Sequence, residues 1–309
     1  MNKTGFVAGT LIHTDKGLVP IEQLEIGDMV LSRDEHNPDG ELAYKRVLNK
    51  FVFPQKQRIV RVAYETVTDA VTDARIKEVE NSEQFYSEDE QTDVFYIYCT
   101  ENHAFWTKEE EWLSAVDLAS DDKGDMDKDY SLVTHNDRPI FRTSYLTFST
   151  PLIRTNIEDI AIQQDHLSDE PGEIYNFIDF SYGKPVILTD TDLPWNFSDR
   201  SWDEQQDHID LKENPNHRFL KKIQTDDNFD VGSNLYFYEN GFISRDTDEF
   251  NDLYNNMTSQ EQNYHSNKSR EEQYYLATVY NIEVEDHHTY FVGEHGVWVY
   301  DSTAKVSKQ

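Results

Sequence analysis

The residue types best able to do chemistry in this chain are histidines, hydroxyls and carboxylates, with a single thiol. Thr100 and His103 stand three positions apart after an apolar run, and His287 and His288 are adjacent near the C-terminus. Imidazole groups transfer protons near neutral pH, so these residues could belong to a site. Taken alone, however, a strand-end hydroxyl and a turn histidine can simply satisfy backbone groups. Both interpretations stay open at this point.

Metal and thiol chemistry are not indicated. The eleven histidines show no metal-ligand spacing with carboxylates or with Cys99, so neither a metal nor any other cofactor is expected. Residues 121–129 (DDKGDMDKD) resemble a calcium loop but lack the full ligand spacing and the closing Glu, so they predict a solvated loop. Cys99 lies in the run DVFYIYCT, where a small apolar residue in a strand is favoured over a reactive thiol.

The elements that must position the candidate residues are mainly β-strands. The clearest signal is at residues 278–302, where Tyr280, Ile282 and Val284 alternate with polar residues. A turn at 293–296, which contains two glycines, separates this run from a final apolar stretch. Period-two alternation around a glycine-containing turn predicts a hairpin or two paired strands.

The first half of the chain is expected to consist mainly of short strands. Pro54 predicts a turn between two longer strand candidates. Residues 20–26 predict one or two helical turns, and residues 109–119 predict a short helix because its acidic start suits the helix dipole. Residues 66–92 predict a loop or a ragged hairpin. The strand candidates are residues 10–14, 18–19, 29–34, 43–53, 58–65, 93–100 and 103–107.

The net charge of −32 is extreme for 309 residues. Such a surface repels nucleic acid, whose binding depends on clustered Lys and Arg, and it also disfavours anionic membranes. Between residues 138 and 272, short β-like pieces alternate with acidic, Asn- and Asp-rich connectors. The charge indicates either solubility or an acidic face that binds a basic protein partner. Residues 1–30 contain no apolar run long enough for a signal peptide or a membrane anchor, so a cytoplasmic location is expected.

Three blocks of the sequence, residues 6–35, 100–107 and 278–302, together resemble the Hint (hedgehog/intein) family. The resemblance is to the pretoxin-type Hint domains of bacterial polymorphic toxins, which are often exported. It implies a Hint core at residues 5–135 and 275–302, an insertion at 136–274 and a polar tail at 303–309. It also implies an all-β, horseshoe-like fold of twisted strands that brings both chain ends together. Members of the family cleave or splice their own peptide bonds, so no separate substrate is expected.

The resemblance assigns helper roles to residues that the chain retains. Thr100 and His103 match the block that polarises the N-terminal peptide bond in the family. His288 matches the histidine that assists from the penultimate strand. Ser302 stands where the family usually carries its last nucleophile.

The residues that break bonds in the family are replaced here. Gly5 stands at the position of the opening Cys, and glycine has no nucleophilic side chain. Thr4 is one residue out of register and is expected to point to the other side of an extended segment. Asp301 stands where the family cyclises an Asn, and a carboxylate should attack its own peptide carbonyl only slowly at neutral pH. Tyr300 replaces the penultimate His, which weakens proton transfer further.

These substitutions predict a Hint-type autoprocessing domain of polymorphic-toxin origin that is catalytically impaired. One alternative is slow self-cleavage between Asp301 and Ser302. Another is direct attack of Ser302 on the bond between Thr4 and Gly5. A third is a binding module in which the acidic insertion recognises a basic protein and the Hint core only holds it. The spatial prediction common to the cleavage hypotheses is that both chain ends lie side by side, with Thr100 and His103 facing them.

Overall fold

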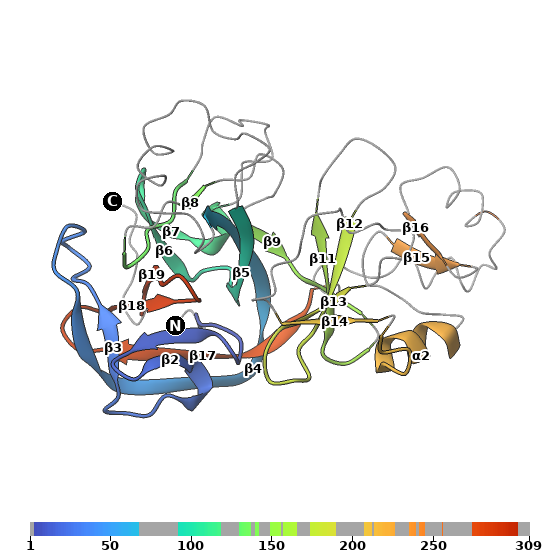
Figure 1. Ribbon diagram of the computed structural model, residues 1–309, viewed down its shortest axis with the longest axis horizontal. Coiled ribbons are helices and arrows are strands. Elements are labelled where there is room, and N and C mark those ends of the chain that lie inside the picture. The colour runs from blue at the N-terminus through green and yellow to red at the C-terminus, as the bar shows by residue number, and fades with distance from the viewer. Residues whose placement is uncertain are drawn as a thin grey trace. The chain divides into compact units, whose positions relative to one another are not determined.

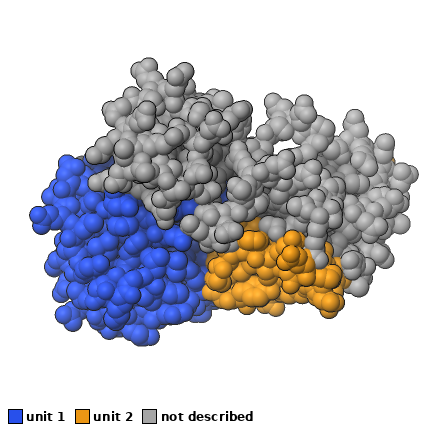
Figure 2. All heavy atoms as spheres, viewed as in Figure 1, with its two compact units in different colours: residues 1–150, 277–309 blue, residues 151–276 orange. Residues whose placement is uncertain are grey.

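A computed structural model shows the arrangement of the chain (Figure 1). The chain forms two compact units, residues 1–150 with 277–309 and residues 151–276, which are coloured separately in Figure 2. The predicted loop at 121–129, most of 66–92, Ser302 and the tail lie outside the described residues. The structure describes residues 3–67, 92–118, 130–136, 140–141, 149–155, 157–165, 174–189, 207–211, 213–225, 235–238, 241–244, 255 and 274–301.

The first unit is built on one curled, twelve-stranded sheet with the path β17-β4-β3-β1-β18-β19-β6-β7. Strand β2 pairs with β1, and β5, β8 and β9 pair with β4. Its described residues hold no helix beyond two short 3-10 turns, so the predicted all-β class is confirmed. The strands are β1 Leu11–Thr14, β2 Gly17–Pro20, β3 Met29–Ser32, β4 Ala43–Val67, β5 Thr92–Thr100, β6 Ala104–Thr107, β7 Glu111–Ser114, β8 Ile140–Phe141, β9 Ser149–Pro151, β17 Leu276–Val284, β18 Thr289–Val292 and β19 Val297–Tyr300.

The last two strands form the hairpin that the alternating pattern predicts. Residues pair from Thr289 with Tyr300 to Val292 with Val297. Gly293 and Gly296 both have positive φ, a backbone conformation that only glycine adopts without strain, and this closes the turn. The prediction of paired strands at the end of the chain is therefore confirmed.

Strand β4 runs without interruption through Pro54, so the predicted turn there is wrong. Its first residues pair with β3 through Arg46, and its last residues pair with β5 from Ile59 onward. Pro54 is exposed and lies between these two paired stretches. A proline, which has no N–H to donate, is tolerated at such a position, and the long strand serves two different neighbours at its two ends.

The helix predicted at residues 109–119 is also wrong. The segment instead forms β7, followed by the 3-10 turn η2 (Ala115–Leu118). Glu111 has a φ of 59° and ends a tight turn in which the Thr107 hydroxyl donates to the Glu111 carbonyl at 3.1 Å. Pairing then packs Trp106 edge-on against Trp112, with ring centroids 5.0 Å apart. This aromatic packing outweighs the local helix preference.

The second unit has its own sheet, in the order β10-β11-β12-β13-β14, and a separate hairpin of β15 and β16. Phe177 and Phe219 pack at 4.4 Å between ring centroids in its core. No described helix is long and apolar enough to cross a membrane. The elements are β10 Ile153–Arg154, β11 Ile160–Asp165, β12 Ile174–Asp179, β13 Val186–Thr189, β14 His208–Asp210, α2 Arg218–Thr225, β15 Leu235–Tyr238 and β16 Gly241–Ser244.

Candidate active site

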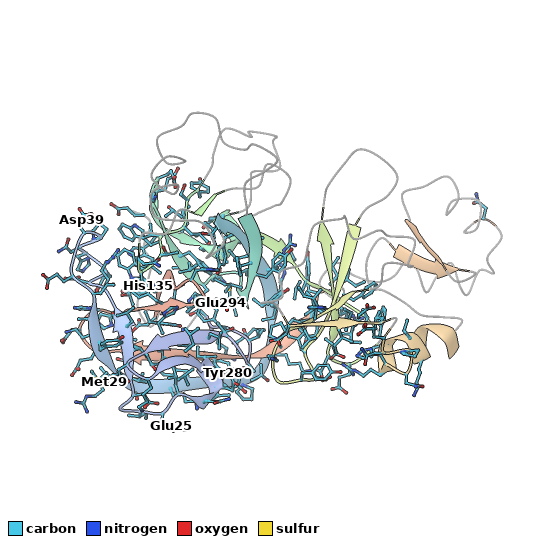
Figure 3. All side chains as sticks on the ribbon, viewed as in Figure 1. Glu25, Met29, Asp39, His135, Tyr280 and Glu294 are labelled. Carbon is cyan, nitrogen blue, oxygen red and sulfur yellow. The ribbon has the colours of Figure 1, made fainter. Side chains whose placement is uncertain are left out.

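Strand β17 holds both chain ends in the first unit. Phe6 donates its N–H to the Tyr280 carbonyl at 2.9 Å, and Tyr280 donates back to Phe6 at 2.8 Å. At the other end, the backbone of Val284 donates to a carboxylate oxygen of Asp301 at 3.0 Å. Tyr280 is labelled on β17 in Figure 3. The prediction that the two ends lie side by side is confirmed.

Thr100, at the end of β5, holds the peptide bond between Thr4 and Gly5, which we call the N-terminal junction. Its hydroxyl oxygen accepts the Gly5 N–H at 3.1 Å, and its own N–H donates to the Gly5 carbonyl at 2.9 Å. Both contacts are buried. The amide nitrogen of the bond between Thr4 and Gly5 is therefore held by the residue that the sequence indicated.

Asn281, in the middle of β17, is the central residue that the sequence did not reveal. Its side-chain nitrogen lies 3.0 Å from the Asp301 carbonyl oxygen, 3.2 Å from the Thr4 carbonyl oxygen and 3.3 Å from the Thr4 hydroxyl. The side chain is 3% exposed. A single amide thus contacts the backbone carbonyls at both junctions. The sequence held only a weak signal for this role. Asn281 is an uncharged polar residue in a predicted strand, and the next polar residues along the chain are glutamates.

His103 is fully buried, and within the described part of the chain neither ring nitrogen has a hydrogen-bond partner. Its ring packs edge-on against Phe6, with the centroids 4.1 Å apart. Burial lowers the pKa of His103 to about 3, so the imidazole is neutral at neutral pH. The ring lies at the N-terminal junction as predicted, but it makes no hydrogen bond to the peptide bond between Thr4 and Gly5.

The side chains of His288 and Asp301 lie close together at the C-terminal junction, the name used for the peptide bond that follows Asp301. The imidazole Nδ1 of His288 lies 3.4 Å from a carboxylate oxygen of the fully buried Asp301, whose N–H donates to the His288 carbonyl at 2.8 Å. His288 adopts a φ of 51°, in the left-handed region, in the connection between β17 and β18. The structure therefore brings these two predicted site residues together.

Tyr300 faces away from this junction. Successive residues of β19 point to opposite sides of the sheet, and Val299 belongs to the main core that also contains Phe6. Tyr300 instead packs on Trp112, with ring centroids 5.2 Å apart. The penultimate side chain is thus separated from Asp301 by the sheet itself.

The space at Gly5 excludes any larger residue. A Cβ atom built on Gly5 would overlap the carbonyl oxygen of Tyr280 and lie 3.0 Å from its carbonyl carbon. Because these are backbone atoms of a paired strand, they cannot move aside without disturbing β17. The direction of Thr4 also differs from the prediction: its buried side chain points toward Asn281, whose Nδ2 lies 3.3 Å from the Thr4 hydroxyl.

The chain is similar to solved inteins. A bacterial intein-like domain from Clostridium thermocellum is 14% identical, with a TM-score of 0.37, and the match covers 97% of this chain and 99% of that one. A DnaB intein from Synechocystis sp. PCC 6803 is 9% identical, with a TM-score of 0.37 and the same coverage. The gp41-1 intein is 19% identical, with a TM-score of 0.25, over 50% of this chain and 91% of that one. No protein-family model and no curated protein matches the chain.

The arrangement supplies hydrogen bonds to peptide carbonyls but few groups that could attack them. Among the described residues, the side-chain oxygens that contact Asn281 or the Val284 N–H are those of Thr4, Tyr290 and Asp301. Cys99 is buried, which raises the pKa of its thiol far above the usual value, so it stays protonated. Across the described residues, no group of three or more His, Cys, Asp or Glu side chains could hold a metal ion.

Proposed function

We propose that this chain is a Hint-type autoprocessing domain, derived from a polymorphic toxin, in which the N-terminal cleavage step is lost and the C-terminal step survives in weakened form. The observation that carries the proposal is the Asn281 amide, which contacts the carbonyl oxygens of Thr4 and Asp301 at 3.2 and 3.0 Å. A hydrogen-bond donor at a carbonyl oxygen stabilises the negative charge that develops when the carbonyl is attacked.

At the N-terminal junction, the peptide bond between Thr4 and Gly5 is held at both of its polar atoms. Asn281 donates to its carbonyl oxygen, and Thr100 accepts from its N–H. The missing element is the nucleophile, because residue 5 has no side chain and no room for one. This junction therefore keeps the means to polarise its bond without a group at residue 5 that could attack it.

At the C-terminal junction, the Asp301 carboxylate stands where an asparagine amide would cyclise. A carboxylate oxygen would bond to the Asp301 carbonyl carbon while the bond to the Ser302 nitrogen breaks. That nitrogen takes a proton and leaves as an amine, and water then opens the five-membered anhydride. The imidazole of His288 lies 3.4 Å from the carboxylate, and it is the group that would donate the proton to the leaving nitrogen. The hydrogen bond from Val284 holds the carboxylate and lowers its reactivity further.

The test is to replace Asp301 with Asn in the full chain and follow the intact mass. An asparagine side-chain nitrogen attacks its own carbonyl to form a succinimide, which releases the segment that follows. We expect D301N to lose residues 302–309 on incubation, while the wild type does so far more slowly. D301A has no group that can cyclise and is the matched control. An unchanged mass of D301N over several days would refute the proposal.

A further inference from the structure

The orientation of the Asn281 amide is fixed by partners that can each play one role only. The Ile282 N–H can only donate, and it lies 2.8 Å from Asn281 Oδ1. The carbonyl oxygens of Thr4 and Asp301 can only accept, and both lie near Nδ2. In the reverse orientation, the amide oxygen would face the two backbone carbonyl oxygens and the amide NH₂ would face the Ile282 N–H. One rotation of the amide would therefore remove both junction contacts at once.

Tyr290 is the second group that holds Asn281 Oδ1. Its hydroxyl, which reaches across from β18, donates to this oxygen at 2.8 Å. The tyrosine is fully buried, and its ring packs edge-on against Phe6 with centroids 6.2 Å apart. Burial, together with the nearby Asp301 and Cys99, raises the pKa of the phenol well above its usual value. The hydroxyl thus remains a donor throughout the ordinary pH range.

We propose that Tyr290 is a positioning residue for the cleavage site: its hydroxyl locks the Asn281 amide so that Nδ2 faces both junction carbonyls. The inference rests on the proposed function for its effect on cleavage, but the orientation of the amide can be tested separately. Tyr290 contacts neither carbonyl in the described contacts and acts through Asn281. The ring of Tyr290 packs in the core whether or not the residue positions Asn281. The positioning role therefore depends on the hydroxyl alone.

The first experiment compares cleavage rates in the D301N background. Y290F keeps the ring and removes the hydroxyl, and we expect release of residues 302–309 to slow about tenfold, the effect of one lost hydrogen bond. Substituting 3-fluorotyrosine at position 290 restores the hydroxyl and should return the rate to that of D301N alone. Y64F is the matched control, because Tyr64 is another buried phenol whose hydroxyl lies 3.4 Å from His295. Equal rates in D301N and Y290F/D301N would overturn the proposal.

The second experiment follows the side-chain amide of Asn281 by ¹⁵N NMR, without any cleavage. In Y290F we expect its two proton signals to shift and to exchange faster with water, while Y64F leaves them unchanged. Unchanged Asn281 signals in Y290F would overturn the positioning role. If D301N is inert but these signals move, the proposed function fails and the positioning of Asn281 stands.

Discussion

The side-chain nitrogen of Asn281, in β17, lies 3.0 Å from the carbonyl oxygen of Asp301, which follows β19 and is 20 positions away along the chain. The same nitrogen reaches the carbonyl of Thr4 at 3.2 Å, across 277 positions. A single buried amide therefore contacts the backbone at both ends of the fold.

Removing the Asn281 amide should impair both cleavage and folding. In the D301N background, N281A removes the donor to the Asp301 carbonyl, so release of residues 302–309 should slow by about 10²–10³-fold. It also leaves the Tyr290 hydroxyl and the Ile282 N–H without their acceptor, at a cost of about 1–3 kcal/mol in the free energy of unfolding. Intact mass and urea denaturation measure the two effects. Asn37, an exposed asparagine in the connection between β3 and β4, provides the control variant N37A, which should change neither.

Introducing a cysteine at position 5 should not produce cleavage between Thr4 and residue 5. The added Cβ would overlap the carbonyl oxygen of Tyr280, so G5C and G5A should both lose about 1–3 kcal/mol of stability. We expect no loss of residues 1–4 from G5C when a thiol reagent is added. Stability comes from urea denaturation and cleavage from intact mass. Thiol-dependent release from a stable G5C protein would show that the Tyr280 carbonyl of β17 does not occupy the space beside residue 5.

Protonation of His103 should destabilise the fold in acid. Its pKa is about 3 in the folded protein and near 6.5 in an unfolded chain, so the unfolded state binds the proton first. Its contribution to stability is complete above pH 6.5 and falls as the pH drops toward 3, by up to about 1.4 kcal/mol per pH unit. H103L, which cannot titrate, should show a shallower loss of stability between pH 6.5 and 4 in urea unfolding. H36L removes an exposed histidine and should keep the wild-type slope; identical slopes for H103L and wild type would contradict the prediction.

His288 should assist release at the C-terminal junction. Asparagine tolerates the left-handed backbone at this position, so H288N removes the imidazole with little strain. In the D301N background we expect H288N to slow release of residues 302–309 by about 10²–10⁴-fold, the usual effect of removing a proton-transfer group. H287N at the neighbouring histidine is the control and should cleave at the rate of D301N. Equal rates for H288N and H287N would assign no role to His288.

The parts of the fold that follow from local patterns were predictable. The alternation of apolar residues around Gly293 and Gly296 indicated the terminal hairpin, which the pairing of β18 with β19 confirms. The positions of Thr100 and His288 beside the junctions also agree with their sequence blocks. The helix predicted at residues 109–119 was wrong, because local helix propensity takes no account of the cross-strand pairing of Trp106 with Trp112.

The sequence by itself determined that this is a β protein, that residue 5 carries no nucleophile and that position 301 carries a carboxylate, because residue type and period-two spacing are local properties. Only the tertiary structure decided that Thr4 points toward the site, that Gly5 has no room for a side chain and that Asn281 joins the two ends. These depend on which backbone passes within hydrogen-bonding distance, and β17 reaches the N-terminus from more than 270 positions away. Long-range strand pairing fixes such distances, and no short stretch of the chain encodes them.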